Sequence, residues 1–176
     1  AALAEALKVN TALTTLDVRE NSIGAEGVRA LKEGLCVRQE AVGMVCSYEG
    51  SRMACHEPDL SRVFAIARNM TENVGQMTQV SFANEQIGYQ GVIVLAEALK
   101  VNTEVKELDL RGNALCDNSA RVLAEALKVN TALTTLDLED NSIGDEGALG
   151  LAEALKVNTA LTTLKLEENS IGDEGA

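Results

Sequence analysis

The stretch LAEALKVNTALTTL, from Leu123 through Leu136, decides the fold, because it returns letter for letter from Leu151 through Leu164, 28 residues further on. The same letters occupy Leu3 through Leu16, and Leu95 opens another copy that reads LAEALKVNTEVKELDL. An internal period of this length is the signature of a solenoid, whose units bury their apolar faces only against their neighbours. The sequence therefore predicts a repeat array.

Two units depart from this template. The unit from 66 to 94 is 29 residues long and has MTQVSF in place of LTTLDL. The unit from 31 to 65 is degenerate, with an insertion of about seven residues around Gly50 to Pro58. We expect one array over 1–176, with units near 3–30, 31–65, 66–94, 95–122, 123–150 and 151–176. Ala1 and Ala2 hold the last positions of a further unit, so we expect a piece of a longer array.

Each regular unit contains L-x-x-L-x-L-x-x-N, as in Leu133, Leu136, Leu138 and Asn141. At these residues the sequence resembles the leucine-rich repeat family. The 28- and 29-residue units with a helical half LAEALKVN resemble its ribonuclease-inhibitor-like subfamily. The resemblance implies an α/β solenoid shaped as a horseshoe, with a parallel sheet on the concave face and helices on the convex face.

The strand half of each unit has a period of two. Leu136 and Leu138 are predicted to face inward, while Thr135, Asp137 and Glu139 face outward. Because helices are wider than strands, the stack must curve with its strands on the inside. The Asn at the end of each motif carries a donor and an acceptor, which suits a buried ladder that satisfies backbone polar groups.

The second half of each unit changes to a helical period. Its apolar stripe in one copy comprises Ala148, Leu151, Ala152 and Leu155. Asp145 is predicted to cap the start of this helix, and Asn158 is predicted to close it in the left-handed conformation.

The net charge argues against two classes of partner, and the cysteines indicate the cellular compartment. Asp and Glu number 27 against 15 Lys and Arg, and the net charge of -12 repels phosphate backbones and anionic headgroups. We therefore expect no nucleic-acid or membrane partner. The four cysteines are scattered, which favours free thiols in a reducing compartment and predicts a cytoplasmic protein.

Residues for chemistry are scarce. His56 is the single histidine and lies beside Cys55, but adjacency in sequence does not make two side chains face each other. Cys46, Cys55 and His56 also lack the spacing of zinc ligands. The carboxylates recur in the same places in each unit, whereas acid/base catalysis needs two different environments. We expect a protein that is not an enzyme and binds no cofactor or metal.

The outward positions of the strands predict a binding surface that is mainly acidic, with nine acidic and three basic side chains in the regular units. The degenerate unit adds Tyr48 as a candidate anchor, predicted to lie between Arg19 and Gln79, although this unit can also be a decayed repeat without a role. The predicted partner-binding residues are Asp17, Arg19, Val45, Tyr48, Gln79, Ser81, Glu107, Asp109, Arg111, Asp137, Glu139, Lys165 and Glu167.

The leading hypothesis is a protein-interaction scaffold that binds a protein partner on its acidic concave face, whose charge favours a basic partner. Proteins with similar repeats include GTPase-activating proteins for Ran, so a regulator of a small GTPase that uses Arg19 or Arg111 is an alternative. A shared fold alone is weak evidence for such a role. A further alternative is an architectural spacer, since nearly identical units offer few differences from which to build a specific site.

Overall fold

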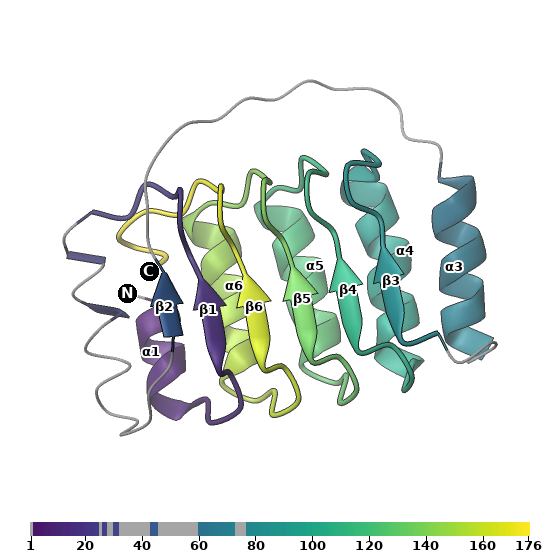
Figure 1. The fold of residues 1–176 in the computed structure, drawn as a ribbon, viewed down its shortest axis with the longest axis horizontal. Coiled ribbons are helices and arrows are strands. Elements are labelled where there is room, and N and C mark those ends of the chain that lie inside the picture. Colours follow the sequence, from purple (N-terminus) through teal and green to yellow (C-terminus); the bar gives the residue numbers. More distant parts are fainter. Residues whose placement is uncertain (1, 25, 28–29, 32–42, 46–59, 73–76) are drawn as a thin grey trace.

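The computed structural model describes residues 2–24, 26–27, 30–31, 43–45, 60–72 and 77–176. These residues form a two-layer solenoid, in which a six-stranded parallel sheet is backed by one layer of helices (Figure 1). We call the open side of the sheet the concave face and the helical side the convex face. The predicted α/β horseshoe is confirmed.

Each strand is three residues long, and the helices range from 8 residues in the first to 14 in the longest. The strands are β1 (Thr15–Asp17), β2 (Gly43–Val45), β3 (Gln79–Ser81), β4 (Glu107–Asp109), β5 (Thr135–Asp137) and β6 (Thr163–Lys165). The helices are α1 (Ala2–Val9), α3 (Ser61–Glu72), α4 (Gly88–Val101), α5 (Asp117–Leu127) and α6 (Asp145–Leu155).

Neighbouring strands pair at the same position of the repeat. Leu136 in β5 aligns with Leu108 in β4 on one side and with Leu164 in β6 on the other. These leucines are buried to within 1% exposure, and so are the next inward residues of the motif, Leu110 and Leu138. The predicted inward register of the motif leucines is therefore confirmed, and side chains of equal position stack into rows across the sheet.

The spatial order of the strands differs from their order along the chain. It is β2-β1-β6-β5-β4-β3, so the N-terminal strand β1 pairs with β6 instead of opening the array (Figure 1). The reason lies in the repeat itself. The stretch from Leu3 to Leu16 has the same letters as the regular units, so its face fits against β6 and α6 as a consecutive unit would.

This order corrects the prediction for the degenerate unit. Its strand β2 pairs with β1 among the described strands, whereas Gln79 lies in β3 at the opposite edge of the sheet. The predicted placement of this unit between Arg19 and Gln79 is therefore wrong. Val45 lies in β2, and Tyr48 lies outside the described residues.

The motif asparagines form the predicted buried ladder. The Nδ2 group of Asn141 donates to the carbonyls of Leu138 (3.0 Å) and Glu139 (3.0 Å) in its own unit, and to Leu110 (3.1 Å) in the preceding one. Its Oδ1 accepts from the backbone amides of Asn113 (3.1 Å) and Leu115 (2.9 Å). Each such asparagine thus ties the turn after one strand to the turn after the next.

Asn158 does not end its helix in the predicted left-handed conformation, and instead belongs to a second ladder of buried asparagine side chains. This residue is buried and is not among the described residues with positive φ. Its Nδ2 donates to the carbonyls of Leu127 (2.6 Å) and Asn130 (3.0 Å), and its Oδ1 accepts from Ala160 and Leu161. The asparagine after each helix therefore joins two units. Its side chain donates to carbonyls at the end of the helix in the preceding unit, which have no hydrogen-bond partner within that helix.

Asp145 also acts between units and not as the predicted helix cap. Gly144 precedes α6 without a side-chain cap, and Asp145 is the first residue of the helix. Its Oδ1 accepts from the backbone amides of Gly172 (2.7 Å) and Gly175 (3.0 Å) in the adjacent unit. Asp117 and Asp173 make the equivalent bonds at the two flanking joints.

We expect Leu136→Ala to lower the free energy of unfolding by about 2–5 kcal/mol, because it opens a cavity in the core shared by three strands. The neighbouring change Thr135→Ala removes a half-exposed side chain and is expected to cost under about 0.5 kcal/mol. Chemical denaturation monitored by circular dichroism measures both. Equal losses for the two variants would contradict the register.

We expect Asn141→Ala to cost at least about 2 kcal/mol, because it leaves buried backbone donors and acceptors without partners. Asn118→Ala is the matched control, since Asn118 is exposed on α5 and its side chain makes no hydrogen bond in the described structure. The same denaturation experiment compares the two variants, and equal destabilisation would show that the asparagine ladder does not stabilise the fold.

Candidate functional site

The concave face presents two rows of polar side chains. In β1 and in β3 to β6, the first and third residues of the strand project from the sheet while the middle Leu or Val faces the core. One row runs across the strand starts through Gln79, Glu107, Thr135, Thr163 and Thr15. The other row runs across the strand ends through Ser81, Asp109, Asp137, Lys165 and Asp17. The 28-residue period thus converts single polar positions into continuous lines.

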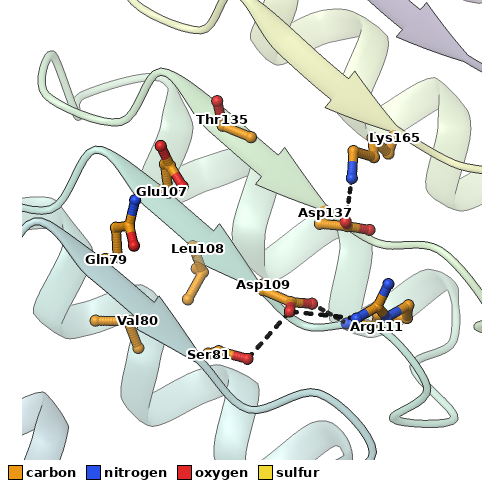
Figure 2. A pocket seen from close by; sticks show the side chains of 10 residues that line it. All are labelled: Gln79, Val80, Ser81, Glu107, Leu108, Asp109, Arg111, Thr135, Asp137 and Lys165. Carbon is orange, nitrogen blue, oxygen red and sulfur yellow. Dashed lines mark hydrogen bonds and ion pairs between the residues drawn. The ribbon is translucent and has the colours of Figure 1, made fainter.

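A shallow cavity of about 300 Å³ lies over β3, β4 and β5 and reaches the side chain of Lys165 (Figure 2). Its lining residues are Gln79, Val80, Ser81, Glu107, Leu108, Asp109, Arg111, Thr135, Asp137 and Lys165. Seven of these belong to the predicted site. The prediction did not include Val80 and Leu108, which are buried in the sheet below, or Thr135, which it placed outward without assigning it to the site.

The basic side chains of this cavity are held by carboxylates of the same face (Figure 2). The Nζ of Lys165 lies 2.7 Å from Oδ2 of Asp137, and Nη2 of Arg111 lies 3.8 Å from Oδ2 of Asp109. Ser81 adds a hydrogen bond from its Oγ to the same oxygen of Asp109, at 3.0 Å. The pair with Asp137 raises the pKa of Lys165, and the hydrogen bond is the largest cause.

Arg19 forms a second ionic centre, nearer the β1 edge. Its Nη2 lies 2.7 Å from Oδ2 of Asp17 and 2.6 Å from Oε2 of Glu167, across the joint between β1 and β6. Burial of Asp17 acts to raise the pKa of its carboxyl, but the hydrogen bonds and charge of Arg19 outweigh it and leave the pKa below the usual value. The pKa of Glu167 is raised by burial and by the charge of Asp17.

Two predicted contact residues are less accessible than expected. Asp17 is 8% exposed and Asp137 is 6% exposed. Both project from the concave side of the sheet, but Arg19 and Lys165 engage their carboxylates. A partner would therefore meet the ion pairs and not the isolated carboxylates.

The remaining acidic side chains leave this face negatively charged. Within the described part of the chain, the carboxylates of Glu107 and Glu139 form no ion pair, whereas Arg19, Arg111 and Lys165 all do. Carboxylate oxygens of Glu20, Glu167 and Glu168 lie within 4.8 Å of one another. Burial and the charges of Glu20 and Asp140 raise the pKa of Glu168. Each of the three residues places one oxygen in this group, fewer than the six to eight oxygens typical of calcium sites, so we interpret the group as part of the negative charge of the face.

The residues considered for chemistry, Cys46, Cys55 and His56, lie outside the described residues. Cys116 is a half-buried free thiol immediately before α5. No helix among the described residues is both long enough and apolar enough to cross a membrane.

Comparison with known protein families shows the family to which the chain belongs. The model of the TMOD/LMOD leucine-rich domain matches residues 61–174, and a model of the leucine-rich repeat matches residues 9–32. The first match covers more than half of the sequence, so the chain belongs to the tropomodulin and leiomodin leucine-rich domain family. The predicted leucine-rich repeat family is confirmed. The ribonuclease-inhibitor-like assignment stays a prediction.

Many solved structures are similar to this chain, among them a leiomodin domain and a tropomodulin domain. One is the Leiomodin-1 Actin-Binding Site 2, with 27% sequence identity and a TM-score of 0.55, over 66% of this chain and 64% of that chain. The other is the C-terminal domain of a Caenorhabditis elegans tropomodulin, with 20% identity and a TM-score of 0.57, over 62% of this chain and 66% of that chain, which supports the fold alone. The chain thus spans slightly less than two thirds of each structure. No curated protein matches this sequence.

We expect Arg19→Gln to raise the pKa of Asp17, because burial then acts without the opposing guanidinium. In the unmodified protein the pKa of Asp17 lies below its usual value of 3.8. The ionised carboxylate therefore stabilises the folded state above that pH, and this stabilisation is lost as the pH falls through the lowered pKa. In the variant this stabilisation should disappear. Carboxyl carbon NMR titration measures the pKa directly. Arg121→Gln, which removes a convex-face partner of Glu146, should leave Asp17 unchanged, and an unshifted Asp17 in Arg19→Gln would refute the coupling.

Proposed function

We propose that this chain is a protein-interaction scaffold whose concave face receives a basic segment of a partner. The observation that carries the proposal is the unequal pairing of charges on that face. Its basic side chains Arg19, Arg111 and Lys165 form ion pairs with carboxylates of the same face. Glu107 and Glu139 form no ion pair among the described residues. Negative charge thus remains available to a partner, and charge complementarity of this kind steers association and selects partners.

The shape of the face supports the same use. The cavity over β3 to β5 has Glu107 and Asp109 in its lining. A lysine or arginine side chain combines an alkyl stem with a cationic head, so it can lie in a shallow cavity with its charge beside these carboxylates. The predicted contact residues of β3 to β6 are accordingly proposed to form the centre of the interface.

Actin is the first partner that we propose to test. The reason is the similarity to the Leiomodin-1 Actin-Binding Site 2 at 27% identity. A cytoplasmic location is part of this proposal and agrees with the free thiol of Cys116, since reducing compartments keep cysteines unpaired. We also propose that the six repeat units predicted from sequence form one binding array, and that this array has no catalytic role.

The two alternatives have less support. A regulator of a small GTPase would need an arginine free to reach the partner's nucleotide, whereas Arg19 and Arg111 are both paired with carboxylates of this chain. An architectural spacer would agree with the near identity of the units, but it gives no reason for the excess of acidic groups on the concave face. A GTPase stimulation assay with a Ran-like partner separates the first alternative from binding alone.

We expect the double variant Glu107→Lys/Glu139→Lys to weaken binding of actin at least tenfold, or about 1.4 kcal/mol, because it reverses the available charge at the centre of the face. The matched control is Glu97→Lys/Glu125→Lys, which makes the same change in net charge on exposed convex positions of α4 and α5. Co-sedimentation and calorimetry at two salt concentrations measure both. Equal loss in both variants would assign the effect to net charge and overturn the concave site, and absence of binding by the unmodified chain would exclude actin.

A further inference from the structure

The joint between the first and last described units is not formed by consecutive units of the chain. Helix α1 and strand β1 pack on α6 and β6, and the backbone amides of Ala2 and Leu3 donate to the carbonyls of Glu174 (3.2 Å) and Gly175 (3.1 Å). The C-terminal turn and α1 thus together occupy the space that one continuous helix fills in the other units (Figure 1). We call this contact the α1/α6 joint.

The α1/α6 joint reproduces the hydrogen bonds of a joint between consecutive units. The Nδ2 of Asn10 donates to the carbonyls of Leu155 (2.7 Å) and Asn158 (3.1 Å). At the preceding joint, the Nδ2 of Asn158 donates to Leu127 (2.6 Å) and Asn130 (3.0 Å). The two patterns match partner for partner, so the specificity of the contact lies in the repeat and not in the covalent connection.

The aspartate bridge matches as well. Gly24 and Gly27 donate their amides to Oδ1 of Asp173, at 2.6 and 3.1 Å. Asn21 continues the inner ladder by donating its Nδ2 to the carbonyl of Leu166 at 2.7 Å. The ion pair of Arg19 with Glu167 adds a contact across the same joint. The outer face of the last unit therefore receives a complete set of partners from the N-terminal unit.

We propose that the α1/α6 joint is a self-association surface, at which the N-terminal unit of one copy docks on the C-terminal unit of a second copy of this chain. Each contact at the joint is non-covalent and is indifferent to which copy supplies it. Within one copy, docking is favoured by a high effective concentration; between copies, it is favoured as the protein concentration rises. Reciprocal exchange of the N-terminal unit closes a two-fold dimer, as in domain swapping.

The test uses two variants of the chain of residues 1–176 in which the aspartate bridge can form only between copies. Asp173→Lys removes the acceptor of this bridge but keeps Gly24. Gly24→Leu fills the space next to Asp173, since a Cβ on Gly24 would lie 3.0 Å from its Oδ2, and it leaves Asp173 intact. Each variant alone lacks one half of every possible aspartate bridge, within one copy or between identical copies. An equal mixture restores one intact bridge per pair of chains, so we expect its mass by light scattering to double from 18.6 kDa.

The control mixes Asp173→Lys with the double variant Gly24→Leu/Asp173→Lys, which offers no intact acceptor and should stay at the mass of one chain. A mixture of the two single variants that also stays at that mass would overturn the proposal. Concave-face charges are unchanged in all of these variants, so the outcome is independent of the proposed partner binding.

Disulfide trapping provides a second measurement that does not depend on those variants folding. The amide of Thr14 donates to the carbonyl of Thr162 at 2.7 Å across the α1/α6 joint. One isotope-labelled copy carries Thr14→Cys and an unlabelled copy carries Thr162→Cys, so a linkage between positions 14 and 162 must join two chains. The control pairs Thr134→Cys with Thr162→Cys, whose backbone contact lies at a joint of consecutive units. A 14–162 linkage in excess of the control supports exchange, and equal yields refute it.

Discussion

The structure depends on satisfying backbone polar groups at each joint between units. A three-residue strand and a short helix leave many amides and carbonyls without partners inside their own unit. Buried asparagines such as Asn141 and Asn158 take up several of these groups at once, and each bridges to the adjacent unit. Among the described residues, no buried side-chain nitrogen or oxygen lacks a hydrogen-bond partner. The ladders therefore fix the register of the array, and the leucine core follows that register.

This constraint also creates the binding face. Once the units are in register, the outward residues of successive strands form rows, and the chemistry of a row depends on which side chains become neighbours. Lys165 neutralises Asp137 from the next strand, and Arg19 reaches Glu167 across a joint between units far apart in sequence. Glu107 is left without such a partner in the described structure. The charge available to a ligand is thus smaller and more localised than the count of acidic residues indicates.

Repetition has a second consequence, because a unit with the regular letters can follow any other such unit. The pairing of β1 with β6 uses the same contacts as the pairing of β5 with β6. Where a unit docks therefore follows from the complementarity of its faces, and the order of the array in space need not repeat the order of the chain. In a domain with a single irregular core, the face of each element is complementary to one specific set of neighbours, so its elements cannot exchange places in this way.

The sequence by itself determined the period, the alternation of strand and helix, the inward leucines and the asparagine ladder, since each depends on spacing within one unit. It also placed most of the cavity residues on one face. Tertiary structure decided what depends on contacts between units: the order of the strands, the burial of Asp17 and Asp137, and the use of Asp145 and Asn158 as bridges instead of helix caps. The physical reason is that a side chain near a helix end can reach its own backbone or that of its neighbour, and only the stacked array determines which is closer.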